Sequence, residues 1–160
     1  MPTSRTLTLF RPGGPYDGPI PALPPGLPRR FPEAGLLLNH GLLVAELLEV
    51  DTEAAAATLE LAEGGPEGLI RALDEEDAGL LAPFFDEVAQ SLQNALDPAG
   101  LPQGSAGSLL AASPLVTTDE PGRLILRSHR LPLIELRDRL PTLARYLRFA
   151  ADHGLWALFD

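Results

Sequence analysis

The feature that most constrains this chain is a change of hydrophobic period at Pro132. Before Pro132, residues 115–118 and 123–131 alternate polar with apolar positions around the breaker sequence Asp-Glu-Pro-Gly at 119–122, which predicts two strands joined by a turn. After Pro132, apolar residues recur every three or four positions from Leu136 to Ala151, which predicts one apolar stripe along a helix. The last third of the chain is therefore expected to be a hairpin followed by a long helix.

Length and composition limit the class of protein. A chain of 160 residues that is 45% hydrophobic predicts a single domain, residues 1–160, with one core. It has no apolar run of about 18 residues and no signal-peptide pattern, so we expect a cytoplasmic protein without a membrane span. The absence of cysteine excludes disulfides, thiol catalysis and thiolate metal sites. All 12 basic residues are arginines, which excludes lysine-dependent phosphate loops and Schiff-base chemistry.

The net charge of −10 is unevenly distributed. Residues 1–120 contain 18 acidic residues and five arginines, a balance of −13, whereas residues 121–160 contain four acidic residues and seven arginines, a balance of +3. This layout suits an acidic protein surface, including that of a second copy, or a phosphate backbone, although the solvated side of any surface helix carries similar charges. The residues of the predicted basic face are Arg123, Arg127, Arg130, Arg137, Arg145 and Arg148.

Residues 11–34 are expected to form a proline- and glycine-rich arm or long loop. Eight prolines and four glycines lie within residues 11–32, and they disfavour helix and central strand alike. Spaced apolar residues favour an arm that lies across the domain or across a partner over a flexible linker: Tyr16, Ile20, Leu23, Leu27 and Phe31. The PxxP spacing of Pro21 and Pro24 also allows a docking site for proline-binding modules.

Residues 35–63 admit two interpretations. As a helix, Leu36, Leu43 and Leu47 fall on one side, and four consecutive alanines at 54–57 favour helix formation. As a sheet, three runs at 35–39, 42–50 and 56–63 are separated by short polar breaks. The sheet is preferred, because Asn-His-Gly between two leucine runs is typical of a hairpin and residues 58–63 alternate between polar and apolar positions. We therefore expect a meander of three strands.

The remaining segments complete an α+β domain. Residues 6–10 predict a short edge strand, residues 67–73 a short helix, and residues 101–108 a loop of small residues. Four carboxylates at 74–77 precede the apolar positions of a strong amphipathic helix that ends near Leu96, with Pro83 expected in its first turn. The expected architecture has helices packed on one face of an antiparallel sheet made of the meander and the C-terminal hairpin.

The final strand and its transition into the last helix, read from residue 124 as LILRSHRLPL, have a recognisable pattern. Together with the helix at 80–96, they resemble the last third of type III secretion chaperones and the related YbjN-like proteins, over about residues 66–158. The resemblance implies a type III secretion chaperone-like fold and an acidic homodimer that binds a client protein and catalyses nothing, associated with a stress response or regulation. The family fold usually opens with an amphipathic helix, whereas this chain opens with a strand and the arm.

Candidate interface residues cluster towards the end of the chain. Aromatic and apolar side chains of this kind are common interface anchors, although they can also fold back onto the core: Trp156, Phe159, Leu155, Leu158, Tyr146 and Phe149. We expect them to serve a non-catalytic protein-binding module. The alternative is a nucleic-acid-associated regulator that uses the C-terminal arginine face, although the total charge of −10 opposes a phosphate backbone.

Sequence patterns give no support to an enzyme. His40, His129 and His153 form no pair at i,i+4 spacing and have no carboxylate at ligand spacing. The acidic residues at 74–77 lack the alternation of a calcium loop, and Ser105 does not lie in a nucleophile elbow. We therefore expect no catalytic residue, no cofactor and no metal site.

Overall fold

The structure, a computed structural model, describes residues 6–62 and 72–159 and confirms the α+β class. The described residues form five α-helices: α1 Ala34–Leu47, α2 Glu53–Ala62, α3 Glu75–Ala95, α4 Gly104–Ala111 and α5 Leu133–Asp152. They also form two antiparallel sheets of three strands each, ordered β2-β1-β6 and β3-β4-β5. The strands are β1 Leu7–Phe10, β2 Arg30–Phe31, β3 Val116–Thr118, β4 Leu124–Leu126, β5 Leu131–Pro132 and β6 Trp156–Phe159.

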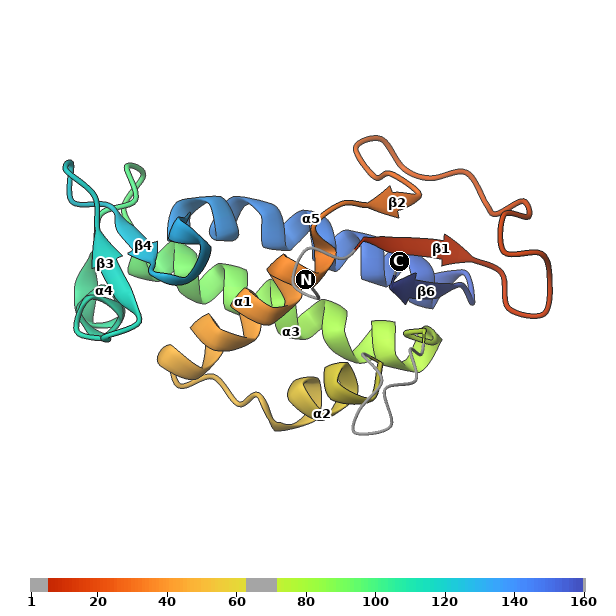
Figure 1. The fold of residues 1–160 in the computed structure, drawn as a ribbon, viewed down its shortest axis with the longest axis horizontal. Helices are drawn as coiled ribbons and strands as arrows, with labels where there is room; N and C mark the ends of the chain where they lie inside the picture. The colour runs from red at the N-terminus through yellow and green to blue at the C-terminus, as the bar shows by residue number, and fades with distance from the viewer. Residues whose placement is uncertain (1–5, 63–71, 160) are drawn as a thin grey trace.

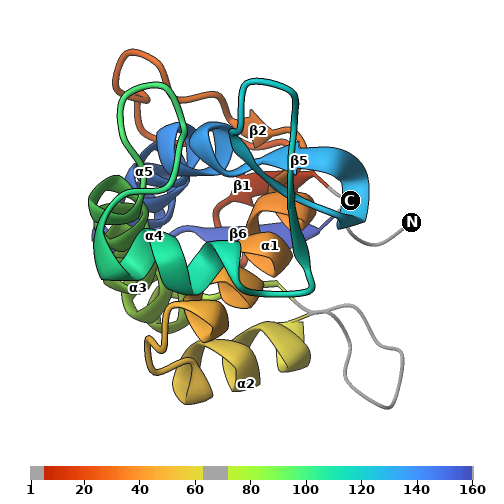
Figure 2. The ribbon, with the colours of Figure 1, turned by 90° about the vertical axis from the view of Figure 1, so that its left-hand side faces the viewer.

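The centre of the molecule is the antiparallel pair of α3 and α5, with one small sheet at each end of the pair (Figure 1). Both helices bury an apolar stripe at helical spacing, which is the signal by which the sequence predicted them. The facing stripes consist of Leu81, Phe85, Val88 and Leu92 on α3 and of Leu136, Leu140, Leu143 and Leu147 on α5, all of them fully buried. Figure 2, which looks along the pair, places α1 beside it and α2 below.

Helix α3 begins earlier than the sequence analysis expected. Asp74 caps it, because its Oδ1 accepts a hydrogen bond of 2.9 Å from the backbone N–H of Asp77, whose carboxylate accepts one from the N–H of Asp74. The expectation that Pro83 lies in the first turn is therefore wrong. Pro83 lies well inside the helix, on its exposed side, where the carbonyl that loses its helical donor can face water.

The C-terminal third follows the prediction. Strand β3 pairs with β4 around the predicted turn, with Val116 opposite Leu126 and Thr118 opposite Leu124, and α5 begins directly after Pro132. The return strand is shorter than predicted, since β4 ends at Leu126 and a 3₁₀ turn, Ser128–Arg130, follows. The chain then pairs back onto β4 through β5 before α5 starts.

The meander predicted over residues 35–63 is wrong: this segment contains α1 and α2, so the predicted single sheet is replaced by two small ones. The Asn-His-Gly sequence lies in the middle of α1, where His40 Nδ1 donates to Leu36 O at 2.8 Å, one helical turn back. Burial on several sides of α1 removes the single apolar stripe that identifies a helix in a sequence, which explains the error.

The loop predicted over residues 101–108 is also wrong in its second half, where α4 begins at Gly104. The sequence does not indicate α4, because its small residues bury little apolar area and give no periodic signal. Gly107 explains the position of the helix: a Cβ there would lie 2.6 Å from the carbonyl oxygen of Ala95. The backbone of α4 thus packs directly against the end of α3.

Strand β1 is confirmed as a strand, but it is the central strand of its sheet and the expectation of an edge strand is wrong. The C-terminal residues pair with it as β6, with Leu7 opposite Phe159 and Phe10 opposite Trp156. The helix predicted over residues 67–73 lies mostly outside the described residues. Its last residue, Leu73, forms an isolated antiparallel bridge with Ala157 on the far side of β6.

Residues 11–34 run as a long loop that includes β2 and leads into α1. Leu27 and Phe31 of this arm are buried, and Ile20 and Leu23 pack against the core, so the arm covers this chain's own domain. Tyr16, by contrast, is 41% exposed. The arm therefore supplies core residues along most of its length and an exposed aromatic ring near its start.

We predict that Gly41→Ala lowers the free energy of unfolding by about 1–3 kcal/mol. A Cβ at Gly41 would lie 2.7 Å from Cε1 of Phe85 and 3.4 Å from Cδ2 of Leu140, so α1 would have to move away from the α3–α5 pair. Chemical denaturation measured by circular dichroism tests this.

Gly79→Ala is the matched control. A Cβ at this helical glycine meets only the Cβ of Ala151, at an ordinary contact distance of 3.7 Å. We expect this variant to be neutral or to gain up to about 1 kcal/mol, because alanine favours the helix. Equal effects of the two substitutions would contradict the close approach at Gly41.

Candidate functional site

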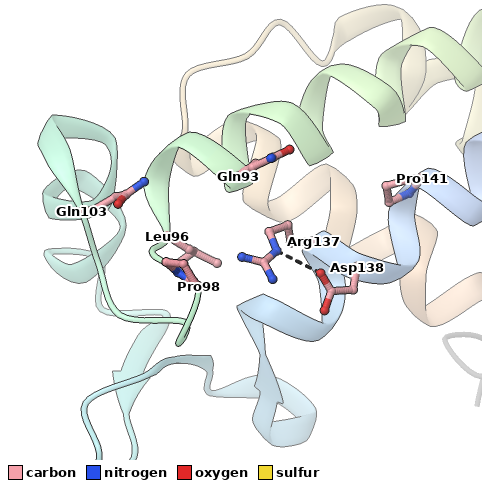
Figure 3. A pocket seen from close by; sticks show the side chains of 7 residues that line it. All are labelled: Gln93, Leu96, Pro98, Gln103, Arg137, Asp138 and Pro141. Carbon is pink, nitrogen blue, oxygen red and sulfur yellow. Dashed lines mark hydrogen bonds and ion pairs between the residues drawn. The ribbon is translucent and has the colours of Figure 1, made fainter.

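A cavity of about 580 Å³ lies where the end of α3 faces the first half of α5 (Figure 3). Its walls combine apolar, amide and charged side chains: Gln93, Leu96, Pro98, Gln103, Arg137, Asp138 and Pro141. The volume falls within the range of small-ligand and peptide side-chain sites.

Arg137 is the main polar group of this cavity. Its guanidinium extends from α5 towards Leu96 and Pro98, with Nε donating to Asp138 Oδ1 at 2.9 Å and Nη1 to the carbonyl of Asp97 at 3.5 Å (Figure 3). Because Asp138 balances its charge, the cavity is better suited to a neutral amide or a single carboxylate than to a multiply charged phosphate.

A second candidate site is the aromatic cluster of Phe10, Tyr16 and Trp156 on the outer face of the β2-β1-β6 sheet. The ring centroids of Phe10 and Tyr16 are 5.5 Å apart, and those of Phe10 and Trp156 are 6.2 Å apart. Alternation along the strands explains the exposure: Leu9 and Ala157 face the core, so their neighbours Phe10 and Trp156 face outwards. Trp156 is 37% exposed, which is unusual for its size and is typical of interaction surfaces.

Arg29 fixes the arm over this face. Its Nε donates to the carbonyl of Leu9 at 3.1 Å, and its Nη2 donates to the carbonyl of Tyr16 at 3.1 Å. A small cavity of about 260 Å³ remains beside the cluster, lined by Thr8, Tyr16, Asp17, Arg29 and Arg30. The aromatic cluster is therefore held in place by the arm and borders a small hollow.

The six predicted interface residues occupy different environments. Trp156 is exposed and Leu158 is partly buried, whereas the other four are buried in this chain's own core: Leu155, Phe159, Tyr146 and Phe149. The hydroxyl of Tyr146 lies 3.0 Å from the carbonyl oxygen of Leu7 and 2.9 Å from that of Arg29, which ties α5 to the sheet. Of the predicted set, the structure thus leaves chiefly Trp156 exposed.

The six arginines of the predicted basic face are distributed from the β3–β4 hairpin to the last turns of α5. Arg123 pairs with Asp119 at 2.6 Å, and Arg148 pairs with Asp86 at 2.6 Å. Although desolvation raises the pKa of Asp119, its hydrogen bonds with Arg123 lower this pKa overall. Three others donate to backbone carbonyls: Arg127 to Pro114, Arg137 to Asp97 and Arg145 to Pro25. Arg130 is exposed, in a left-handed conformation with φ 48°.

A contact between distant segments joins His40 of α1 to Ser128, 88 residues later in the chain. His40 Nε2 lies 3.0 Å from Ser128 Oγ, and the ring of His129 meets that of His40 edge-on, with centroids 5.0 Å apart. The His40 side chain is buried, and this desolvation lowers its pKa, an effect that His129 reinforces and the bond to Leu36 partly offsets. Burial therefore favours the neutral form of His40.

Sequence reasoning missed the roles of several of these residues. Phe10 and Tyr16 were assigned to a strand and an arm, but nothing in the sequence places them beside Trp156. His40 and Ser128 are also brought together only by the fold. The local signal available was the presence of aromatic residues towards both ends of the chain, and it does not specify which of them are neighbours.

Within residues 6–62 and 72–159, no group of three or more histidine and carboxylate side chains is placed to hold a metal ion. Over the same residues, no helix combines the length and the apolar character needed to cross a membrane. Comparisons with family models, with curated proteins and with solved structures found no match to this chain.

We predict that the free energy of unfolding decreases as the pH falls from about 7 to 5. The pKa of His40 is lowered in the folded state, so the unfolded chain binds its proton first, from about pH 6.5 downwards, and protonation favours unfolding. Denaturation curves measured at several pH values test this. His40→Gln should flatten the dependence, whereas His153→Gln, which removes an exposed ring, should retain it. An unchanged slope in His40→Gln would contradict this assignment.

Proposed function

We propose that this protein is a non-catalytic protein-binding module, a chaperone-like or adaptor homodimer that binds a client protein in a stress response or in regulation. The observation that carries the proposal is the aromatic cluster of Phe10, Tyr16 and Trp156 on the outer face of the β2-β1-β6 sheet. Tryptophan and tyrosine dominate the binding energy of protein interfaces, since each buries a large area with few rotatable bonds.

The rigidity of the cluster supports this proposal. Phe10 and Trp156 are paired across two strands, and Arg29 anchors the arm that carries Tyr16. A partner that packs on rings already held in place loses less conformational entropy than one that must order them.

The charges beside the cluster indicate the chemistry of the partner. Arg11, directly after β1, and Arg30, in β2, are exposed near the cluster, as is Asp17, on a molecule whose net charge is −10. The partner that fits is an apolar residue flanked by carboxylates. An acidic peptide segment with an apolar anchor has this chemistry, and it is the client class that we propose.

A second copy of the chain offers the same chemistry, which supports the homodimer. Leu80 on α3 is 40% exposed and lies close in sequence to the carboxylates of Glu75 and Glu76. The start of α3 lies at the same end of the molecule as β6, because Leu73 pairs with Ala157 (Figure 1). Two copies related by a two-fold axis can therefore place the aromatic cluster of each against the acidic start of α3 of the other.

We predict that the wild-type chain sediments as a dimer and that Trp156→Ala weakens the dimer by roughly 30-fold in Kd, which corresponds to about 2 kcal/mol for a central tryptophan. Sedimentation velocity over a concentration series measures this. Leu115→Ala is the matched control, because Leu115 is 45% exposed at the opposite end of the molecule, next to β3. A wild-type monomer, or equal weakening in both variants, would contradict the proposed dimer.

We predict that affinity capture from the native lysate retains a defined protein partner after nuclease treatment, and that Trp156→Ala loses this partner while Leu115→Ala keeps it. Mass spectrometry of the retained proteins identifies the client. Retention that disappears with nuclease, or that falls steeply as salt rises, would instead favour a nucleic-acid-associated regulator acting through the C-terminal arginines.

A further inference from the structure

We propose that Ser128 is a nucleophilic serine that accepts acyl groups from activated esters, with His40 as the general base that removes its proton. This proposal does not depend on the aromatic cluster or on the proposed dimer, which lie elsewhere in the molecule. The reaction is the transfer of one acyl group to the Ser128 hydroxyl, with no turnover.

The hydrogen bonds of His40 fix the direction of the contact. A carbonyl oxygen can only accept, so the 2.8 Å contact between Nδ1 and Leu36 O places the ring proton on Nδ1. In the neutral ring Nε2 then carries no proton and can only accept. The hydroxyl of Ser128, 3.0 Å away, must therefore donate its hydrogen bond to Nε2. A serine whose proton points at the lone pair of an oriented, neutral imidazole has the geometry of an activated nucleophile.

The general base is buried and the nucleophile is exposed, as this chemistry requires. His40 is 4% exposed, which lowers its pKa and keeps Nε2 unprotonated near neutral pH. Ser128 is exposed, so an acyl donor can reach Oγ from solvent.

The backbone around Ser128 is also unusual. The two residues that follow it, His129 and Arg130, have φ values of 61° and 48°, a left-handed conformation that is uncommon for residues other than glycine and that is found often at functional sites. This turn leaves Ser128 at the surface between β4 and α5, facing α1.

Charged groups surround this contact on the turn, at the start of α1 and on α5. The turn carries Arg127 and Arg130, both exposed, and His129 packs edge-on against His40. On the flanking helices, Arg139 of α5 pairs with Glu33, just before α1, at 3.7 Å. No carboxylate among the described residues is hydrogen-bonded to His40 or Ser128, so no negative charge in direct contact opposes the transfer of the Ser128 proton to Nε2.

The acyl donor of the test reaction is p-nitrophenyl acetate. The Oγ–H bond of Ser128 breaks and its proton moves to His40 Nε2, while the oxygen lone pair forms a bond to the carbonyl carbon. The bond from that carbon to the phenolic oxygen then breaks, and the electron pair leaves with p-nitrophenolate. The products are O-acetyl-Ser128 and p-nitrophenolate, and His40 returns its proton to solvent.

The test uses the full-length protein and p-nitrophenyl acetate, with release of p-nitrophenolate followed by absorbance and the acetylated residue located by peptide mass spectrometry. We expect one acetyl group per chain on Ser128, transferred roughly 10²-fold faster than to other serines, the usual contribution of a positioned general base. Ser128→Ala should abolish this fast phase. Ser108→Ala is the matched control, because Ser108 is an exposed serine whose hydroxyl bonds only to the backbone carbonyl of Gly104.

The pH dependence tests the role of His40 without any substitution that alters the fold. Acetylation of Ser128 should rise with pH through a midpoint below the ordinary histidine value of about 6.5 and then level off. His40→Gln, checked for folding by circular dichroism, should lose the plateau and slow the reaction by roughly 10²-fold. Labelling spread evenly over several serines, or a rate that increases with hydroxide concentration and shows no plateau, would overturn the proposal.

Discussion

The packing of α3 against α5 is the interaction on which the rest of the structure depends. Each helix contributes a stripe of large apolar side chains at helical spacing, and the two stripes bury one another along most of both helices. Every other element is positioned against this pair: α1 approaches it at Gly41, α4 packs on the end of α3 through Gly107, and the two sheets lie at its ends. Burial of these stripes supplies the free energy that offsets the ordering of the less regular segments.

The two close approaches at glycine show how the α3–α5 pair restricts which side chains its neighbouring helices can carry at the contact. At Gly41 the obstacle is the ring of Phe85, and at Gly107 it is the backbone carbonyl of Ala95. Both helices are poor in the periodic apolar signal that marks α3 and α5 in the sequence, because α1 is buried on several sides and α4 consists largely of small residues. Their conformation is decided by the surface they meet, which explains why the sequence predicted a meander for one and a loop for the other.

The candidate sites differ in how far the sequence could indicate them. The exposed Trp156 was predicted as an interface anchor, but its neighbours Tyr16 and Phe10 come from the opposite end of the chain, through the pairing of β1 with β6. Most of the other predicted anchors face the core, since a buried and an exposed aromatic side chain are identical in sequence. Likewise, the arginines counted as one basic face are spread from the β3–β4 hairpin to the last turns of α5, and most are held by carboxylates or backbone carbonyls.

The sequence by itself determined the local elements whose signal is strong within a few turns: the amphipathic helix that follows the carboxylates at 74–77, though not its first residue, the hairpin around residues 119–122, the long helix after Pro132 and the extended arm. Periodicity, capping and breaker residues specify these through neighbours along the chain. Tertiary structure alone decided the helical state of α1, the central place of β1, the aromatic cluster and the contact of His40 with Ser128. Each of these features depends on contacts between residues far apart in the chain. Such contacts stabilise the fold only after the α3–α5 pair has brought the residues together.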